Sequence, residues 1–171
     1  MQKDKGFLDW CLRQKKGIRI VKPSENLVKA YRQKSRNALK SMEVNTQASL
    51  ADWAVSASYY SKYFAVYALF SKIGVKSEIH DCTITLFEHL FSDSIPKEII
   101  KDLRDSKGDR VEAQYYTQEI SVDLEQVMKR AKKFVLAVEK VTDELNTEKI
   151  AELQKKIENS IHQIRRYVGD K

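Results

Sequence analysis

One short stretch of the sequence, DRVEAQYY at residues 109–116, combines groups that could bind a phosphate. Arg110 is charged at every physiological pH, and its planar guanidinium donates hydrogen bonds in a fork that suits a phosphate or a carboxylate. Tyr115 and Tyr116 follow five and six residues later and supply hydroxyls or a stacking face. The stretch also has a structural interpretation, in which Arg110 pairs with a neighbouring acid such as Asp109.

A second polar strip lies on the helix that we expect over residues 49–74. Tyr59 and Tyr63 are one helical turn apart on the less apolar side of this helix, with Asp52 and Ser56 preceding them. A strip of this kind could line a cleft and bind a ligand. The alternative is that both tyrosines are rim residues of the core.

Other patterns that carry chemistry are missing from the sequence. No two glycines are closer than 11 residues, so neither of the common glycine-rich phosphate loops can occur. His80, His89 and His162 are scattered, and no pair of them has the spacing that holds a metal ion on one helix face. We therefore expect no metal site and no cofactor.

The composition indicates one soluble, mainly helical domain. The chain has 171 residues, a net charge of +7, and only five glycines and two prolines, which favours helices over a sandwich or barrel. No apolar run approaches the roughly 20 residues of a membrane span, and the start is not a secretory signal.

The two cysteines, Cys11 and Cys82, make neither a disulfide framework nor a metal-binding spacing. We therefore expect reduced thiols in the cytoplasm.

The positive charge is concentrated at the N-terminus. Residues 1–22 carry a net charge of +5, which leaves +2 for the remainder of the chain. Such a segment could contact phosphates, or it could be a solvated helix face. Apolar residues at helical spacing indicate that one side of this segment packs on the rest of the domain. They are Phe7, Leu8, Cys11 and Leu12.

The apolar pattern along the chain is helical almost throughout. Ser24 is a suitable N-cap for the first long helix, and Gly74 a suitable left-handed cap for the central helix at 49–73. On that central helix, apolar residues recur at spacings of three and four, and others extend the apolar cover around most of the circumference, so we expect the helix to be central in the bundle. The recurring residues are Leu50, Trp53, Ala57, Tyr60, Phe64 and Tyr67. Gly108 should interrupt the chain between a short helix after Pro96 and the helix that carries Arg110. Later apolar stripes predict a long helix capped by Ser121 and a last helix after Thr147.

The predicted fold is an all-α, up-and-down helical bundle without a β-sheet, with four to five core helices plus flanking helices. We divide it into a basic helical segment at 1–22, the bundle at 23–145, and a C-terminal helix at 146–171. The apolar seam of that last helix could pack within the chain or against a second copy. A symmetric homodimer is expected.

Three pieces of the sequence resemble the HEPN domain, a prokaryotic nucleotide-binding helical bundle. They are ASYYSKYFAVYALFSKIGVKSEIH at 57–80, RVEAQYY at 110–116 and RAKKFVLAVEKV at 130–141, and they stand in the order of that family. The resemblance covers roughly residues 24–142. Within the family, the chain is most similar to uncharacterised HEPN proteins found beside small nucleotidyltransferases.

The resemblance implies a bundle that is commonly dimeric, and its active members are metal-independent ribonucleases with an Arg-x(4–6)-His pair. There the arginine stabilises phosphate charge and the histidine moves a proton. Of this pair, this chain has only the arginine, Arg110. The histidine would fall at residues 115–117, which are Tyr, Tyr and Thr. Tyrosine is a poor proton acceptor at neutral pH. A histidine at the position of His80 is typical of the subgroup and could face the arginine across the bundle.

The sequence thus supports three functions. The first is a binding module without the nuclease pair, which contacts a nucleotide, RNA or a nucleotidyltransferase partner in a toxin–antitoxin-like system. Its ligand would meet Arg110, His80 and the tyrosines at 59, 63, 115 and 116, and RNA cleavage would be absent or very slow. The second is an atypical metal-independent ribonuclease that uses Arg110 and His80. The third is a dimeric scaffold protein.

Overall fold

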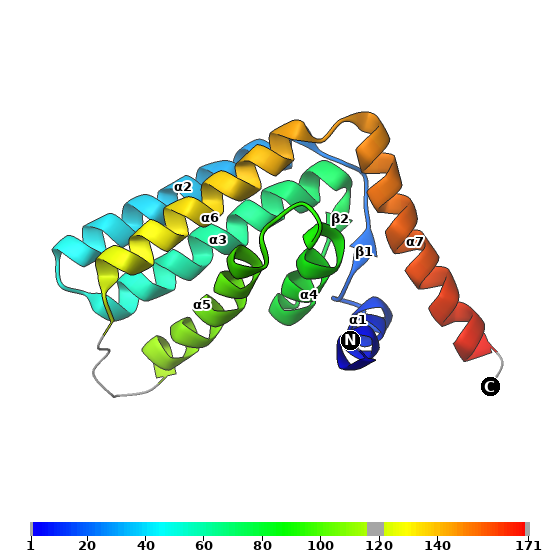
Figure 1. Cartoon of the computed structure of the whole chain (residues 1–171), viewed down its shortest axis with the longest axis horizontal. Coiled ribbons are helices and arrows are strands. Elements are labelled where there is room, and N and C mark those ends of the chain that lie inside the picture. Colours follow the sequence, from blue (N-terminus) through cyan, green and yellow to red (C-terminus); the bar gives the residue numbers. More distant parts are fainter. Residues whose placement is uncertain (1, 116–121, 170–171) are drawn as a thin grey trace.

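The computed structural model describes residues 2–115 and 122–169, and the side chains of residues 6–115 and 122–161. The described chain is an all-α bundle with one very small strand pair, and α2, α3 and α6 run along its long axis (Figure 1). Its helices are α1 (Gln2–Arg13), α2 (Glu25–Gln47), α3 (Ala51–Ile73), α4 (His80–Phe91), α5 (Lys97–Tyr115), α6 (Leu124–Glu144) and α7 (Thr147–Gly169).

Helix α3 is the centre of the bundle, as its apolar sequence predicts. It packs against α2, α5 and α6, and most of its side chains are buried. The helix ends at Gly74, which adopts a left-handed conformation with φ of 70° and donates its backbone N–H to the carbonyl of Phe70. The predicted left-handed cap is therefore confirmed.

The residues of α3 that recur at three and four are mostly less buried than the apolar residues beside them. Trp53 is 62% exposed, Leu50 precedes the helix and is 48% exposed, and Tyr60 and Phe64 are half-buried. The covered sides of α3 hold large apolar residues as well as small ones, and the small residues let neighbouring helices approach closely. One example is the hydroxyl of Ser35 on α2, which donates to the carbonyl of Ser61 at 2.7 Å. The prediction that α3 is covered around most of its circumference agrees with the buried residues along it.

A short β-ribbon contradicts the prediction that no sheet forms. Strand β1 (Arg19–Ile20) pairs antiparallel with β2 (Val75–Lys76), with Ile20 opposite Val75. The left-handed residue Gly74 redirects the chain after α3 into an extended path, and its carbonyl accepts a hydrogen bond from the backbone of Val21 at 2.9 Å. The ribbon fastens the N-terminal segment to the connection between α3 and α4.

The two cysteines are joined, which corrects the expectation of reduced thiols. Cys11 of α1 and Cys82 of α4 form a disulfide between residues 71 positions apart, and both are fully buried. The bond is possible because α1 packs on the first turn of α4 and brings the two Cα atoms to 5.5 Å. Residues so far apart in the sequence give no local pattern that would have shown this pairing.

Helix α5 is continuous, whereas the sequence predicted a break at Gly108. The helix begins after Pro96 and runs through the glycine to Tyr115. Glycine lowers helix stability but does not forbid a helix. Here the packing of Leu103, Ser106 and Ala113, all buried, outweighs that cost.

The last two helices close the bundle. The side chain of Asp123 caps α6 by accepting from the backbone of Gln126 at 3.1 Å, while the predicted cap Ser121 lies outside the described residues. Leu153 and Ile157 on α7 are buried in the main core of the same chain.

The division of the chain into three segments stays a prediction. None of the helices in the described part of the chain is both long and apolar enough to cross a membrane.

Two glycine substitutions should shift stability in opposite directions. A Cβ at position 108 would meet no atom within 4 Å, so Gly108→Ala should stabilise the protein by about 0.5–1 kcal/mol through helix propensity. A Cβ at position 74 would lie 2.5 Å from the carbonyl oxygen of Val21, so Gly74→Ala should destabilise it. Urea unfolding of both variants measures the two changes. A loss of stability in Gly108→Ala would contradict a continuous α5.

Candidate functional site

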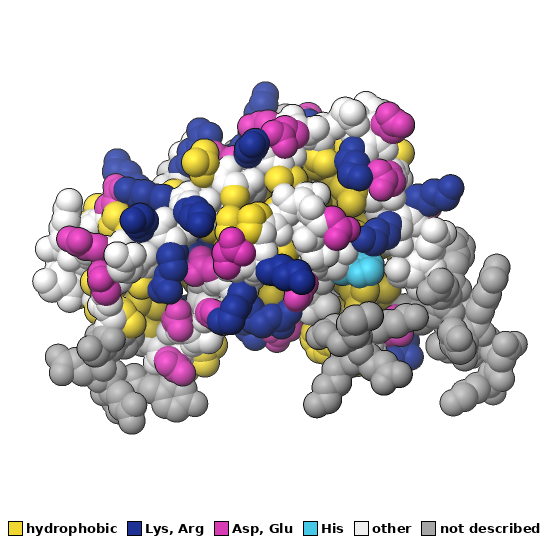
Figure 2. Space-filling model, viewed as in Figure 1, with side chains coloured by type: hydrophobic (Ala, Val, Ile, Leu, Met, Phe, Trp, Pro, Cys, Tyr) yellow, Lys and Arg dark blue, Asp and Glu magenta, His cyan; other side chains and the backbone are white. Residues whose placement is uncertain are grey.

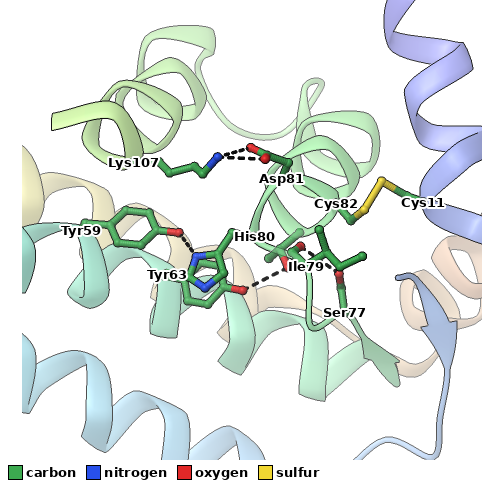
Figure 3. Close-up of polar contacts among 10 residues, drawn as sticks. Cys11, Tyr59, Tyr63, Ser77, Ile79, His80, Asp81, Cys82 and Lys107 are labelled. Carbon is green, nitrogen blue, oxygen red and sulfur yellow. Dashed lines mark hydrogen bonds and ion pairs between the residues drawn. A yellow bond between two sulfur atoms is a disulfide. The ribbon is translucent and has the colours of Figure 1, made fainter. Parts of the chain in front are cut away.

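An imidazole held between two tyrosines forms the centre of the candidate site (Figure 3). His80 is the first residue of α4, and its Nδ1 shares a hydrogen bond with the hydroxyl of Tyr59 on α3. The ring of Tyr63, one turn further along α3, stacks on the imidazole with centroids 4.3 Å apart and an angle of 5°. The hydroxyl of Tyr63 lies 3.4 Å from that of Thr83. These contacts fix the orientation of His80.

Burial keeps these tyrosines uncharged. Burial raises the pKa of both Tyr59 and Tyr63 far above the ordinary value, and the neighbouring Arg110 only partly opposes this for Tyr59. Both side chains are buried, and the interpretation that they line a ligand cleft stays a prediction. They lie on the side of α3 that α4 and α5 cover. Their hydroxyls remain proton donors, and neither phenol is suited to accept a proton at neutral pH.

Arg110 lies beside the same group of rings. Its guanidinium carbon is 5.9 Å from the ring centroid of Tyr59 and 5.3 Å from that of Tyr60, within the range of cation–π attraction. No carboxylate of the described residues pairs with it, and its buried Nε has no hydrogen-bond partner among them. The structural interpretation, in which Asp109 neutralises Arg110, therefore has no support in the described contacts.

Two other cations of α5, Lys107 and Arg104, are paired with carboxylates. Lys107, one turn before Arg110, donates to both carboxylate oxygens of Asp81 at 2.7 and 2.8 Å (Figure 3). Arg104 pairs with Glu88 at 2.7 Å. Lys107 and Asp81 were missed by the sequence interpretation, because a helix broken at Gly108 would not place Lys107 and Arg110 on one face.

The surroundings of His80 favour its neutral form. Burial is the main reason that the pKa of His80 falls below its ordinary value, and the positive charges of Arg110 and Lys107 lower it further. A phenol is a stronger acid than the N–H of a neutral imidazole, so we assign Tyr59 as the donor and Nδ1 as the acceptor in their shared bond. The proton of neutral His80 then resides on Nε2.

A buried lysine links α3 to α5 next to this site. Lys62 is 1% exposed, and its ammonium donates to Asp102 at 2.6 Å and to the hydroxyl of Ser106 at 2.5 Å. Burial lowers the pKa of Lys62, and the charge of Asp102 opposes that shift. Arg130 of α6 approaches the same carboxylate at 3.7 Å. The signal for this contact was present in the sequence, since a lysine inside an almost wholly apolar helix requires an acidic partner.

The predicted ligand residue Tyr115 is not part of the ring cluster. Tyr115 ends α5 and is 73% exposed. Tyr116 lies outside the described residues. The described residues contain no group of three or more His, Cys, Asp or Glu side chains that could hold a metal ion. Positive and negative side chains are interspersed over the face shown in Figure 2, so the described part of this face presents no broad basic surface.

The chain matches one known protein family. The HEPN domain model covers residues 28–141, more than half of the chain, so the chain belongs to the HEPN family. Membership suggests a function related to nucleotides or RNA, and HEPN domains often dimerise and bind nucleic acids. The resemblance to HEPN domains is thus confirmed, while the narrower link to nucleotidyltransferase-associated members stays a prediction. No curated protein matches the chain.

Replacing Arg110 should change the titration of His80. Because the guanidinium is one of the charges that lower the pKa of His80, Arg110→Ala should raise that pKa. Arg104→Ala is the matched control, since it removes an arginine of the same helix that is neutralised by Glu88. The pKa is read from NMR chemical shifts of the imidazole between pH 4 and 8. Equal pKa values in the two variants would show that Arg110 is not close to His80.

Proposed function

We propose that this protein binds the phosphate of a nucleotide or RNA strand through Arg110, with His80 beside it, and does not cleave RNA efficiently. The observation that carries the proposal is the difference among the cations of α5. Lys101, Arg104 and Lys107 each pair with a carboxylate, whereas Arg110 and the exposed Lys97 have no such partner among the described residues. Of these two, Arg110 is the one that lies half-buried against aromatic rings. A guanidinium kept for a phosphate needs free donors, and a structural one has them filled.

The environment of Arg110 strengthens a phosphate contact. The side chain is half-buried against aromatic rings, so less water competes for its donors than on an open surface. The nearby charge of Lys107 is neutralised by Asp81, which leaves the guanidinium as the cation available to an anion in the described part of this cluster. Arginine can bind a phosphate through two parallel hydrogen bonds, which gives orientation as well as affinity.

His80 fits the role of a hydrogen-bond donor in this arrangement. With Nδ1 occupied by Tyr59 and the proton on Nε2, the neutral imidazole can donate to a phosphate oxygen but has no free lone pair for proton abstraction. The family position for a catalytic histidine is held by tyrosine or threonine in this chain. Both points favour binding over rapid cleavage.

Binding of a short single-stranded RNA tests this function. Arg110→Ala should weaken binding by roughly tenfold to a hundredfold, the range expected for a charged hydrogen bond. It should also reduce the dependence of log affinity on log salt by about one unit. Fluorescence anisotropy with a labelled strand measures both effects. Arg104→Ala should leave affinity nearly unchanged, and equal losses in the two variants would contradict a specific role for Arg110.

The ribonuclease alternative has one observation in its favour, which is that His80 and Arg110 lie around the same tyrosine ring. If His80 donated to Tyr59 through Nδ1, its Nε2 would be free to accept the proton of a ribose 2′-hydroxyl. RNA cleavage in the presence of a chelator, lost in His80→Ala and in Arg110→Ala, would support the enzyme. Binding without cleavage would support the proposal above.

Assembly with protein partners is the last element of the proposal. A homodimer agrees with the family's tendency, and a nucleotidyltransferase partner in a toxin–antitoxin-like system remains our proposal for a heterologous complex. The half-exposed aromatic face of α2 and α3, which includes Tyr31, Tyr60 and Phe64, is the apolar surface best suited to a second copy. Light scattering gives the oligomeric state. A dimer that binds neither RNA nor nucleotide would contradict the phosphate-binding function and support the dimeric scaffold instead.

A further inference from the structure

A pocket lies one helical turn beyond Arg110, between the start of α3 and the end of α5. Its volume is about 310 Å³, and its walls are Asp52, Trp53, Ser56, Ala113, Gln114 and Tyr115. Helices α3 and α5 run antiparallel, since Lys62 contacts Ser106 while Tyr59 contacts Arg110. The wall residues therefore continue the same two helices by one turn, about 5.4 Å along the axis.

We propose that this pocket holds the base of the nucleotide whose phosphate contacts Arg110. This inference rests on the proposed function and adds the part of the ligand that the phosphate site does not explain. A ribose separates base and phosphate by a distance comparable to one helical turn. A nucleotide can therefore extend along the junction of α3 and α5 with its phosphate at Arg110 and its base in the pocket.

Two exposed aromatic side chains from different helices border the pocket. Trp53 of α3 is 62% exposed and Tyr115 of α5 is 73% exposed. Large aromatic groups are costly to leave in water, and a planar base is the ligand that both rings can stack on. Stacking tolerates any base, because every base presents an aromatic face.

A buried hydroxyl in the pocket wall also points to a polar ligand. Ser56 is 4% exposed, and its Oγ has no hydrogen-bond partner among the described residues. A buried hydroxyl without a partner loses free energy, so a base that supplies a donor or acceptor would restore the missing bond. The amide of Gln114 provides a second donor and acceptor in the same wall.

The charges along the junction give the ligand its direction. Asp52 lies at the pocket end and would repel a phosphate, whereas its carboxylate accepts hydrogen bonds from the amino and ring N–H groups of a base such as guanine. Arg110 attracts the phosphate to the opposite end. The reverse orientation would place two negative groups together.

The emission of Trp53 tests this subsite directly. The chain has two tryptophans, so Trp10→Phe leaves Trp53 as the sole indole. We compare a guanine-rich RNA strand with an abasic strand of the same length and backbone, and measure affinity by anisotropy competition. The guanine strand should quench Trp53 emission to saturation, while the abasic strand should bind through Arg110 without quenching. In otherwise unchanged protein, Trp53→Ala should weaken the guanine strand about tenfold and leave the abasic strand unaffected.

The outcomes separate this inference from the function on which it rests. Leu136→Ala is the control, because Leu136 is 69% exposed on α6 and does not line the pocket. If both strands bind through Arg110 with equal affinity and Trp53 emission does not change, the base pocket is wrong and phosphate binding stands. If neither strand binds, the proposed function fails and the subsite fails with it.

Discussion

The buried ion pair between Lys62 and Asp102 sets the register between α3 and α5, and the candidate site depends on that register. A charge that is 1% exposed must meet its partner, and breaking such a pair by removing one member costs about 3–5 kcal/mol. The net stabilisation from the intact pair is small, because desolvation offsets the attraction. The main effect of the pair is to fix the position of α5 along α3. A shift of α5 by one turn would lose this bond and move Arg110 away from Tyr59.

The same register explains why polar chemistry gathers on one side of α3. Between α3 and α5, Lys62 is neutralised and closed off by Asp102 and Ser106, both of α5. Toward α4, His80 enters between Tyr59 and Tyr63, and α5 brings Arg110 to the edge of those rings. Water is largely excluded from the first group and only partly from the second. The first group is therefore structural, while the second retains donors that a ligand can reach.

Much of the fold followed from the sequence, but several contacts of the site did not. The helical periods, the cap at Gly74 and the family resemblance predicted the bundle correctly. The partner of Cys11 lies 71 residues away and leaves no local signal. Gly108 predicts a helix break, and a break there would separate Lys107 from Arg110. In the structure α5 is continuous, so the two residues share a face. The sequence also cannot show that an arginine beside acidic neighbours has no carboxylate partner in the described part of the chain, because that depends on side-chain directions in the folded protein.

A crystal structure of the protein with a short RNA strand bound tests the central claim most directly. We predict a phosphate oxygen at hydrogen-bond distance from the guanidinium of Arg110, about 2.7–2.9 Å, with the imidazole of His80 beside the same phosphate. This prediction would be contradicted by a bound strand whose phosphates lie elsewhere while a carboxylate of the protein occupies the donors of Arg110.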